Sequence, residues 1–161
     1  MPQLLLSVGV IGELVQPVTQ WGEARWYPRT VLPDAPEVAA GTPLPGGQTY
    51  LGPATLELHH VETGNYRNNL ATGAPRLWVV LGRDGAVVTI TADPAEGESF
   101  TEAGLELAER TVETVPMPPS LATLLADFVV EHHVERVFHK RRRDRADREP
   151  QGRGTTLDDE S

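Results

Sequence analysis

The stretch that decides the fold covers residues 56–81, LELHHVETGNYRNNLATGAPRLWVVL. It begins with the alternating pattern of a half-buried strand, in which Leu56 and Leu58 face the same side. The polar segment over residues 61–72 then predicts a short helix that ends at Gly73, because glycine readily adopts the left-handed conformation that closes a helix. The apolar run LWVVL that follows predicts a central strand covered on both faces.

The other elements follow from similar patterns on either side of this stretch. Strands are predicted over residues 3–11, 21–32, 49–59, 76–82, 86–91 and 111–116, and helices over residues 93–103 and 118–133. Asp84-Gly85 between two apolar runs predicts a hairpin. Pro28 cannot donate a hydrogen bond to a neighbouring strand, which predicts that its strand lies at a sheet edge. Residues 33–48, with four prolines and three glycines, predict an exposed loop.

Together these elements predict an α+β fold. We expect an antiparallel or mixed sheet of five to six strands, with the C-terminal helix packed on one face. Residues 1–139 are expected to form a single domain, and residues 140–161 a disordered charged tail, because the tail lacks the apolar groups that offset ordering. The apolar positions of the last helix change face after His132, which predicts a break near His133 and an extended arm over residues 134–138.

Charge is divided between an acidic body and a basic arm. Residues 1–135 hold six arginines against seventeen acidic residues, a net charge of −11. Residues 136–148 hold seven basic residues against two acidic ones, a net charge of +5. Binding to nucleic acid is not expected, because the acidic body repels a polyanion and the basic run lacks interleaved aromatic residues for base stacking. The arm is expected to stay solvated, to dock on an acidic protein partner or to fold back on the acidic body.

Composition disfavours several kinds of chemistry. The chain has no cysteine, which removes disulfides, thiolate metal sites and a cysteine nucleophile. None of its four serines lies in a nucleophile motif, and its one lysine, Lys140, does not belong to a glycine-rich phosphate loop. Serine hydrolases, kinases and nucleotidyltransferases are therefore disfavoured. The N-terminal apolar run lacks preceding basic residues and is too short to span a membrane, which predicts a cytoplasmic protein without a membrane span.

Side chains suited to specific contacts are densest in residues 59–69. Tyrosine and arginine often anchor protein interfaces, and asparagine amides form directed hydrogen bonds. We therefore predict a recognition surface here, displayed just before the buried strand, and no catalytic residue. The candidates for partner or ligand binding in this segment and in the basic arm are His59, Glu62, Tyr66, Arg67, Asn68, Asn69, Lys140, Arg141, Arg142 and Arg143.

Two alternatives remain open for the same segment. His59 and His132 are candidate metal ligands, since imidazole suits zinc, nickel or iron, but their spacing matches no known motif and no metal is expected. Alternatively, His59, Glu62, Arg67 and His132 would serve a small enzyme or cofactor carrier if they converge in one pocket. No cofactor is expected for a protein that uses this segment as a recognition surface. A molybdopterin-type ligand would fit the small enzyme or cofactor carrier.

Several strings in the chain point to one family. They are Trp26-x-Pro28, LELHHVETGNYRNNL from Leu56, WVVL from Trp78, VPMP from Val115 and DFVVEHHVERVFHKRRRDRAD from Asp127. Over residues 8–147 the chain resembles an uncharacterised bacterial family, domain of unknown function 3305, whose genes lie beside those of formate dehydrogenase and molybdenum-cofactor synthesis. No catalytic or ligand residues are established for that family.

The resemblance implies a context rather than a mechanism. It implies a non-catalytic accessory protein that acts during enzyme maturation. The partner that it implies is either formate dehydrogenase or a molybdenum-cofactor assembly protein. The alternative that it implies is a small enzyme or carrier in the biosynthesis of molybdopterin guanine dinucleotide.

Overall fold

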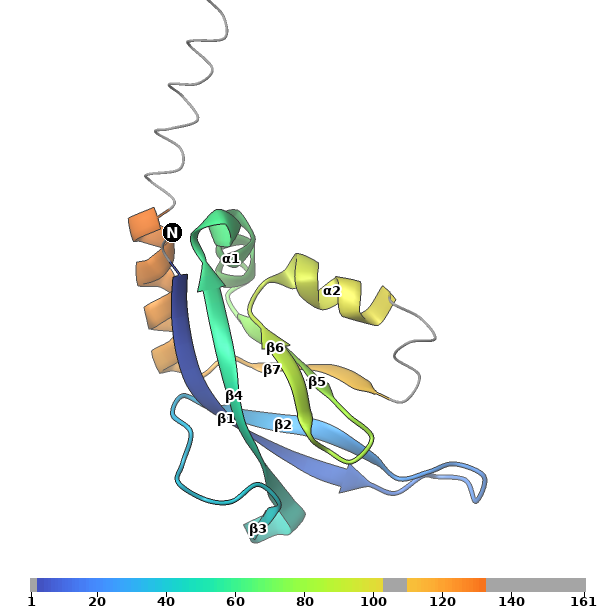
Figure 1. Ribbon diagram of the computed structural model, residues 1–161. Coiled ribbons are helices and arrows are strands. Elements are labelled where there is room, and N and C mark those ends of the chain that lie inside the picture. The colour runs from blue at the N-terminus through green and yellow to red at the C-terminus, as the bar shows by residue number, and fades with distance from the viewer. Residues whose placement is uncertain (1–2, 103–109, 133–161) are drawn as a thin grey trace, which may run out of the picture.

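The computed structural model describes residues 3–102 and 110–132, which form two antiparallel sheets and three α-helices (Figure 1). The predicted α+β class is confirmed. The elements are β1 (Gln3–Val15), β2 (Arg25–Leu32), β3 (Thr42–Leu44), the 3₁₀ turn η1 (Pro45–Gly47), β4 (Gln48–His59), the 3₁₀ turn η2 (His60–Glu62), α1 (Thr63–Ala71), β5 (Arg76–Leu81), β6 (Val87–Thr91), α2 (Pro94–Glu102) and β7 (Thr111–Pro116), followed by a helix over residues 119–132.

The first sheet has four strands in the order β2-β1-β4-β3. β1 is its long central strand and pairs with β2 and β4, with an irregularity in each ladder near Ile11. β2 lies at the edge, as Pro28 predicted. The segment over residues 33–48 is not a loop throughout, because its residues Thr42–Leu44 pair with β4 as strand β3.

The second sheet has three strands in the order β6-β5-β7. β5 is its central strand, and four of its six residues, Leu77, Val79, Val80 and Leu81, are buried. The LWVVL run therefore forms a covered central strand, as expected. The predicted hairpin joins β5 to β6, and Gly85 takes a positive φ of 90° at the turn.

The division into two sheets differs from the single sheet of five to six strands that the sequence predicts. β4 and β6 lie beside each other (Figure 1) but share no ladder among the described residues, so the seven strands divide into groups of four and three. Hydrophobic alternation identifies strands and their buried faces, but it does not specify which strands pair. One strand of each sheet, β4 and β6, lines the candidate functional site.

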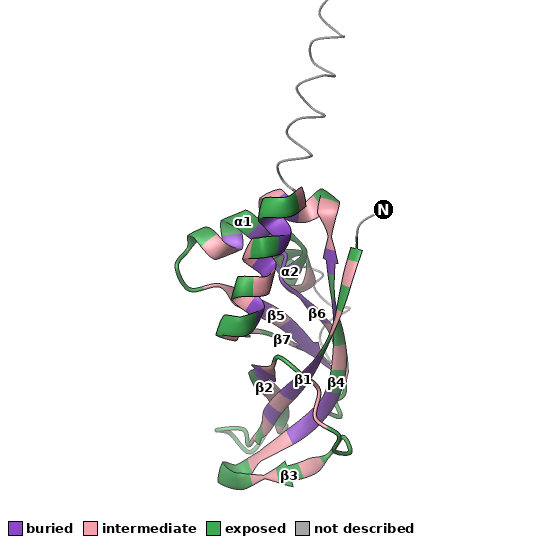
Figure 2. Ribbon diagram, turned by 90° about the vertical axis from the view of Figure 1, so that its left-hand side faces the viewer, coloured by how far each residue is buried: buried purple, intermediate pink, exposed green. Residues whose placement is uncertain are grey.

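The helix over residues 119–132 places Leu121, Leu125, Phe128 and Val129 in the core beside residues of both sheets. Figure 2 shows buried residues along one side of this helix and on β5, with exposed residues facing outward. No helix among the described residues has the length and apolar character needed to cross a membrane. The predicted break near His133, the arm over residues 134–138 and the tail over residues 140–161 fall outside the described residues.

Candidate functional site

A cavity of about 730 Å³ lies between β4 of the first sheet and β6 of the second, next to the starts of α1 and α2. β4, the start of α1, β6 and the start of α2 all contribute to its wall. We call it the acidic cavity, and the described residues that line it are Thr55, Glu57, His59, Val61, Glu62, Asn65, Tyr66, Thr89, Ile90, Thr91, Asp93, Ala95 and Glu96. Four of these residues are acidic, and none is a lysine or an arginine.

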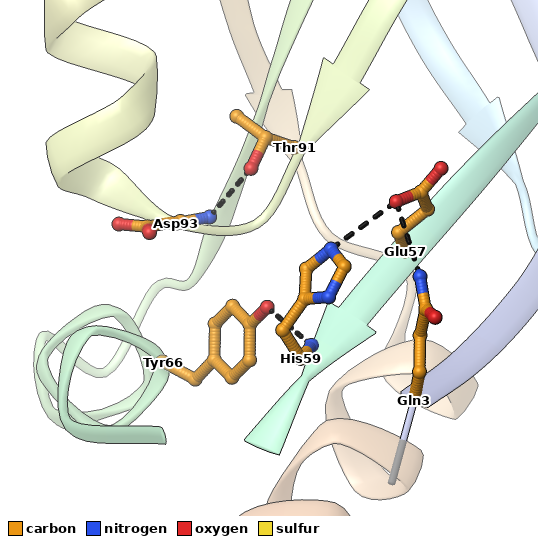
Figure 3. Close-up of polar contacts among 6 residues, drawn as sticks. All are labelled: Gln3, Glu57, His59, Tyr66, Thr91 and Asp93. Atoms are coloured by element: carbon orange, nitrogen blue, oxygen red, sulfur yellow. Dashed lines mark hydrogen bonds and ion pairs between the residues drawn. The ribbon is translucent and has the colours of Figure 1, made fainter. Parts of the chain in front are cut away.

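The carboxylates of the acidic cavity are held by neutral amides and by histidine. The Glu57 carboxylate contacts His59 Nε2 at 3.1 Å and accepts a hydrogen bond from Gln3 Nε2 at 3.4 Å (Figure 3). Asn65 Nδ2 donates to Glu62 Oε1 at 3.1 Å and to Asp93 Oδ2 at 3.2 Å. One amide nitrogen therefore holds together two carboxylates, one from the end of η2 and one from the residue just before α2. No arginine or lysine takes part in these contacts, so acidic side chains outnumber basic ones in the described wall.

Asp93 has a second, structural role at the start of α2. Its Oδ1 accepts hydrogen bonds from the backbone N–H of Ala95 at 2.9 Å and of Glu96 at 3.3 Å. This is the N-cap arrangement that Asp93-Pro94 predicts, with proline at the first helical position. The cap fixes where α2 begins, and it thereby places Glu96 at the wall of the cavity.

Tyr66 forms the inner end of the cavity. Its side chain is only 1% exposed, and its ring packs edge-on against Phe128 with 6.2 Å between the ring centroids. Its hydroxyl accepts a hydrogen bond from the backbone N–H of His59 at 3.0 Å (Figure 3). This bond joins α1 to the end of β4, so Tyr66 sets the spacing between two walls of the cavity.

The burial of the Tyr66 hydroxyl predicts a loss of stability at high pH. Burial is the main cause that raises the pKa of the Tyr66 hydroxyl to about 12, the His59 N–H partly offsets it, and the nearby carboxylates raise it further. The unfolded chain ionises this group near its ordinary pKa of 10.0, so stability falls as pH rises from about 10 to about 12. We expect a loss of about 1 kcal/mol by about pH 11.

Urea denaturation at neutral pH and at about pH 11 measures this loss, with Tyr66→Phe as the comparison. The phenylalanine variant should lose about 1 kcal/mol at neutral pH, because the hydrogen bond to His59 is gone, and should then depend less on pH. Some dependence remains, since burial also raises the pKa of Tyr50. Equal pH dependence in both proteins would show that Tyr66 keeps an ordinary pKa in the folded state.

The four residues at positions 66–69 do not form one exposed surface, which corrects the expectation that they are displayed together. Tyr66 and Asn69 are buried, while Arg67 and Asn68 are exposed. Asn69 Nδ2 donates to the carbonyl oxygens of Arg76 and Ala92 at 2.8 and 2.9 Å, and its Oδ1 accepts from the Arg76 N–H at 3.0 Å. Its amide therefore serves to fasten α1 to the second sheet.

The remaining predicted residues lie in different places. His59 and Glu62 line the acidic cavity, but Arg67 does not. Asn68 lines a different cavity of about 470 Å³ beside Trp78 and Glu98. Lys140, Arg141, Arg142 and Arg143 lie outside the described residues.

The structure does not bring His59 and His132 together as metal ligands. His132 packs with its ring centroid 4.5 Å from that of Phe128 and 6.4 Å from that of His60, away from the wall of the acidic cavity. Across the part of the chain that the structure describes, no group of three or more histidine or acidic side chains is placed to hold a metal ion. The acidic cavity therefore has the charge for a cation but not a ready set of metal ligands.

A family model described as "Protein of unknown function (DUF3305)" matches residues 7–142. The chain belongs to this family. No curated protein and no solved structure matches it. The match covers β1 from Ser7 onward, all elements from β2 to β7 and the helix over residues 119–132. All the residues that line the acidic cavity therefore fall within the part shared with the DUF3305 family.

Sequence reasoning missed half of the acidic wall in this DUF3305 protein. Glu57 and Glu62 are close in sequence to the predicted segment, but Asp93 and Glu96 come from the start of α2. The Asp93-Pro94 cap identified where that helix begins, yet nothing in the sequence placed it opposite α1. That placement depends on how β6 sits beside β4.

Proposed function

We propose that this DUF3305 protein is a non-catalytic accessory protein that holds a protein partner by a cationic segment in the acidic cavity. The observation that carries this proposal is the cavity of about 730 Å³ with four acidic residues and no basic residue in its described wall. Elsewhere on the protein, carboxylates pair with arginines: Glu13 with Arg29 at 3.0 Å and Glu23 with Arg83 at 2.6 Å. No arginine or lysine lines the described wall of the cavity, where histidine, amides and backbone N–H groups contact the carboxylates instead. A basic side chain from another protein would supply the missing type of partner.

Charge of one sign in a concave site is well suited to choosing a partner. Clefts lined by one sign of charge focus the electrostatic field and speed the encounter with an oppositely charged group. They also reject partners of the same sign, so they add specificity more than raw affinity. An arginine fits such a site especially well, because its guanidinium group donates five hydrogen bonds and pairs with carboxylates in a fixed geometry.

The enzyme or carrier alternative is less well supported by the geometry. It requires His59, Glu62, Arg67 and His132 to converge, and only the first two line the acidic cavity. An acidic wall also disfavours a molybdopterin-type ligand, whose phosphate groups are anionic. We therefore retain the accessory role as the proposal.

For the partner we propose formate dehydrogenase or a molybdenum-cofactor assembly protein. The resemblance to the family supports this choice, because it implies that the genes of the family lie beside the genes of those proteins. The basic run Lys140, Arg141, Arg142 and Arg143 is proposed as a second contact, directed at an acidic surface of the same partner. We also propose a cytoplasmic location, as the sequence predicts.

Affinity capture from native cells tests the proposal. The bait is the full chain, compared with the double variant Glu62→Gln/Glu96→Gln, which removes two cavity charges without disturbing the Asp93 cap. The control is Glu98→Gln, which removes one acidic charge from α2 as Glu96→Gln does, but Glu98 lines the other cavity. We expect wild type and control to recover formate dehydrogenase or a cofactor-assembly protein, and the double variant to recover at least about tenfold less.

Two outcomes of this capture experiment would contradict the proposal. Recovery of these partners in equal amounts by all three baits would show that the acidic cavity is not where they bind. If the wild-type chain recovers neither formate dehydrogenase nor a cofactor-assembly protein, the choice of these partners is wrong. A variant in which residues 140–143 are all glutamine measures the share of binding that comes from the basic run.

A further inference from the structure

An exposed leucine lies beside one wall of the acidic cavity. Leu5 of β1 pairs with Glu57 of β4, and directly opposite residues of two antiparallel strands share a face, with their Cβ atoms about 5 Å apart. Leu5 therefore lies next to Glu57, on the face of the first sheet that carries the cavity wall. It is 59% exposed, whereas Leu4 and Leu6 point to the other face and pack against the core.

A second exposed apolar side chain belongs to the cavity itself. Val61 of η2 lines the wall and is 47% exposed. Single hydrophobic residues are common on protein surfaces and need no explanation. Here, however, two of them accompany one group of carboxylates, with Val61 in the wall and Leu5 across Glu57 from it. We call Leu5 and Val61 the apolar rim of the acidic cavity.

The charges beside the apolar rim are too exposed to hold a partner by themselves. The side chains of Glu57 and His59 contact each other at 3.1 Å (Figure 3) but remain 50% and 43% exposed. Ion pairs in contact with water contribute little to affinity, because water and salt screen them. An apolar group that covers Leu5 would exclude water from one side of Glu57, and drier surroundings strengthen its attraction for a cation.

We infer that the partner's segment is amphipathic: it places a basic side chain in the acidic cavity and a large apolar side chain, two residues away, on Leu5. This inference rests on the proposed function and names the kind of segment that the cavity receives. In an extended segment, side chains two residues apart share a face and lie about 7 Å apart, which is long enough to span the step across Glu57. Val61 receives the methylene groups of the basic side chain, because arginine and lysine pack their stems on apolar surface. Leu5 precedes residues 7–142, so the inference concerns this chain rather than every member of the DUF3305 family.

The charge of the protein favours a separate partner over a second copy. Residues 1–135 carry a net charge of −11, so two bodies repel each other. Two of the six arginines in this part, Arg29 and Arg83, already form ion pairs with glutamates of the body. A basic and apolar segment of another protein therefore complements the site better than the surface of a second copy does.

Peptide binding to the full chain tests the inference. The probe is the peptide arginine-serine-leucine-serine-arginine, in which the leucine lies two residues from each arginine. The reference peptide has serine in place of the leucine and carries the same charge. Fluorescence anisotropy measures both affinities for wild type, for Leu5→Ser and for the control Leu14→Ser. Leu14 is another exposed leucine of β1, at 41%, but it lies near the other end of the strand, opposite Trp26 of β2.

We expect wild type and Leu14→Ser to bind the leucine peptide at least about fivefold more tightly than the serine peptide. Leu5→Ser should bind the two peptides equally, within about twofold, and should bind the serine peptide as wild type does. Retained binding of the serine peptide shows that this variant is folded. Equal affinity of wild type for both peptides, or an undiminished preference in Leu5→Ser, would overturn the inference.

Failure of the inference is distinguishable from failure of the proposed function. If wild type binds both peptides equally and Glu62→Gln/Glu96→Gln loses both, the acidic cavity still receives basic groups and only the apolar contact is wrong. If neither peptide binds to wild type, the inference and the proposed role of the cavity fail together.

Two other occupants of the apolar rim would give different results. A full-length variant with Arg141, Arg142 and Arg143 changed to glutamine tests the protein's own basic arm, and a preference for leucine in this variant alone would assign the rim to the arm. A mass that rises with concentration in wild type but not in Leu5→Ser, measured by light scattering, would assign the rim to a second copy. Either result would overturn the inference.

Discussion

Replacing Asn69 by alanine is expected to destabilise the protein by about 4 kcal/mol. Three backbone groups depend on this buried amide: the carbonyl oxygens of Arg76 and Ala92 and the N–H of Arg76. Removing the side chain leaves these groups without their partner, one in a buried and two in partly buried settings. The cost is about 1–3 kcal/mol for each group that water cannot reach. Urea denaturation of the full chain measures the change.

The neighbouring residue provides the control for this prediction. Asn68 has the same side chain and lies in the same helix, but it is exposed. Asn68→Ala should therefore change stability by no more than about 0.5 kcal/mol. Similar losses in the two variants would mean that Asn69 acts through the helix alone and does not join α1 to the second sheet.

Replacing Gly97 by alanine is expected to destabilise the protein by about 3 kcal/mol. A Cβ atom at this position would overlap the Trp78 ring, so α2 and β5 must move apart or the ring must leave its place. Overpacking of this kind typically costs about 1–3 kcal/mol, and a flat ring against a helix backbone leaves little room to adjust. Thermal or urea denaturation measures the loss.

Gly64 in α1 is the matched control, because it has open space around an added Cβ and no positive φ. Gly64→Ala should therefore leave stability unchanged or raise it by up to about 1 kcal/mol, since alanine favours helix over glycine. A tolerated Gly97→Ala would contradict the close contact between α2 and Trp78. That contact matters for the site, because α2 carries Asp93 at its cap and Glu96 in its first turn.

Local sequence patterns specified most elements of the fold, and the stretch over residues 56–81 did so most clearly. Alternation placed Leu56 and Leu58 on the buried face of β4, and Gly73 takes the positive φ of 82° expected of a helix end. These features depend on neighbouring residues only. The pairing of strands depends on contacts between distant parts of the chain, which explains why one sheet was expected and two are present.

The orientation of residues 66–69 could be predicted from the sequence. Residues three apart share a face of a helix, so Tyr66 and Asn69 lie on one side of α1 while Arg67 and Asn68 point elsewhere. The structure shows this division, with the first pair buried and the second exposed. Treating the four residues as one displayed surface ignored the helical period.

The acidic cavity itself was not predictable from the sequence. Its four carboxylates lie at positions 57, 62, 93 and 96, and they meet only because β6 and α2 return beside β4 and α1. The net charge of the body indicated an excess of acidic residues but not their concentration around one cavity. Only the arrangement of the two sheets revealed it.

The most direct test of the central claim, that the acidic cavity receives a basic partner segment, is an NMR titration of the full chain with an eight-residue peptide of alternating arginine and valine. We predict that the largest amide shifts fall in residues 57–66 and 89–96, and that they vanish in the Glu62→Gln/Glu96→Gln variant but persist in Glu98→Gln. Largest shifts around Asn68, Trp78 and Glu98, or equal shifts in all variants, would contradict the claim.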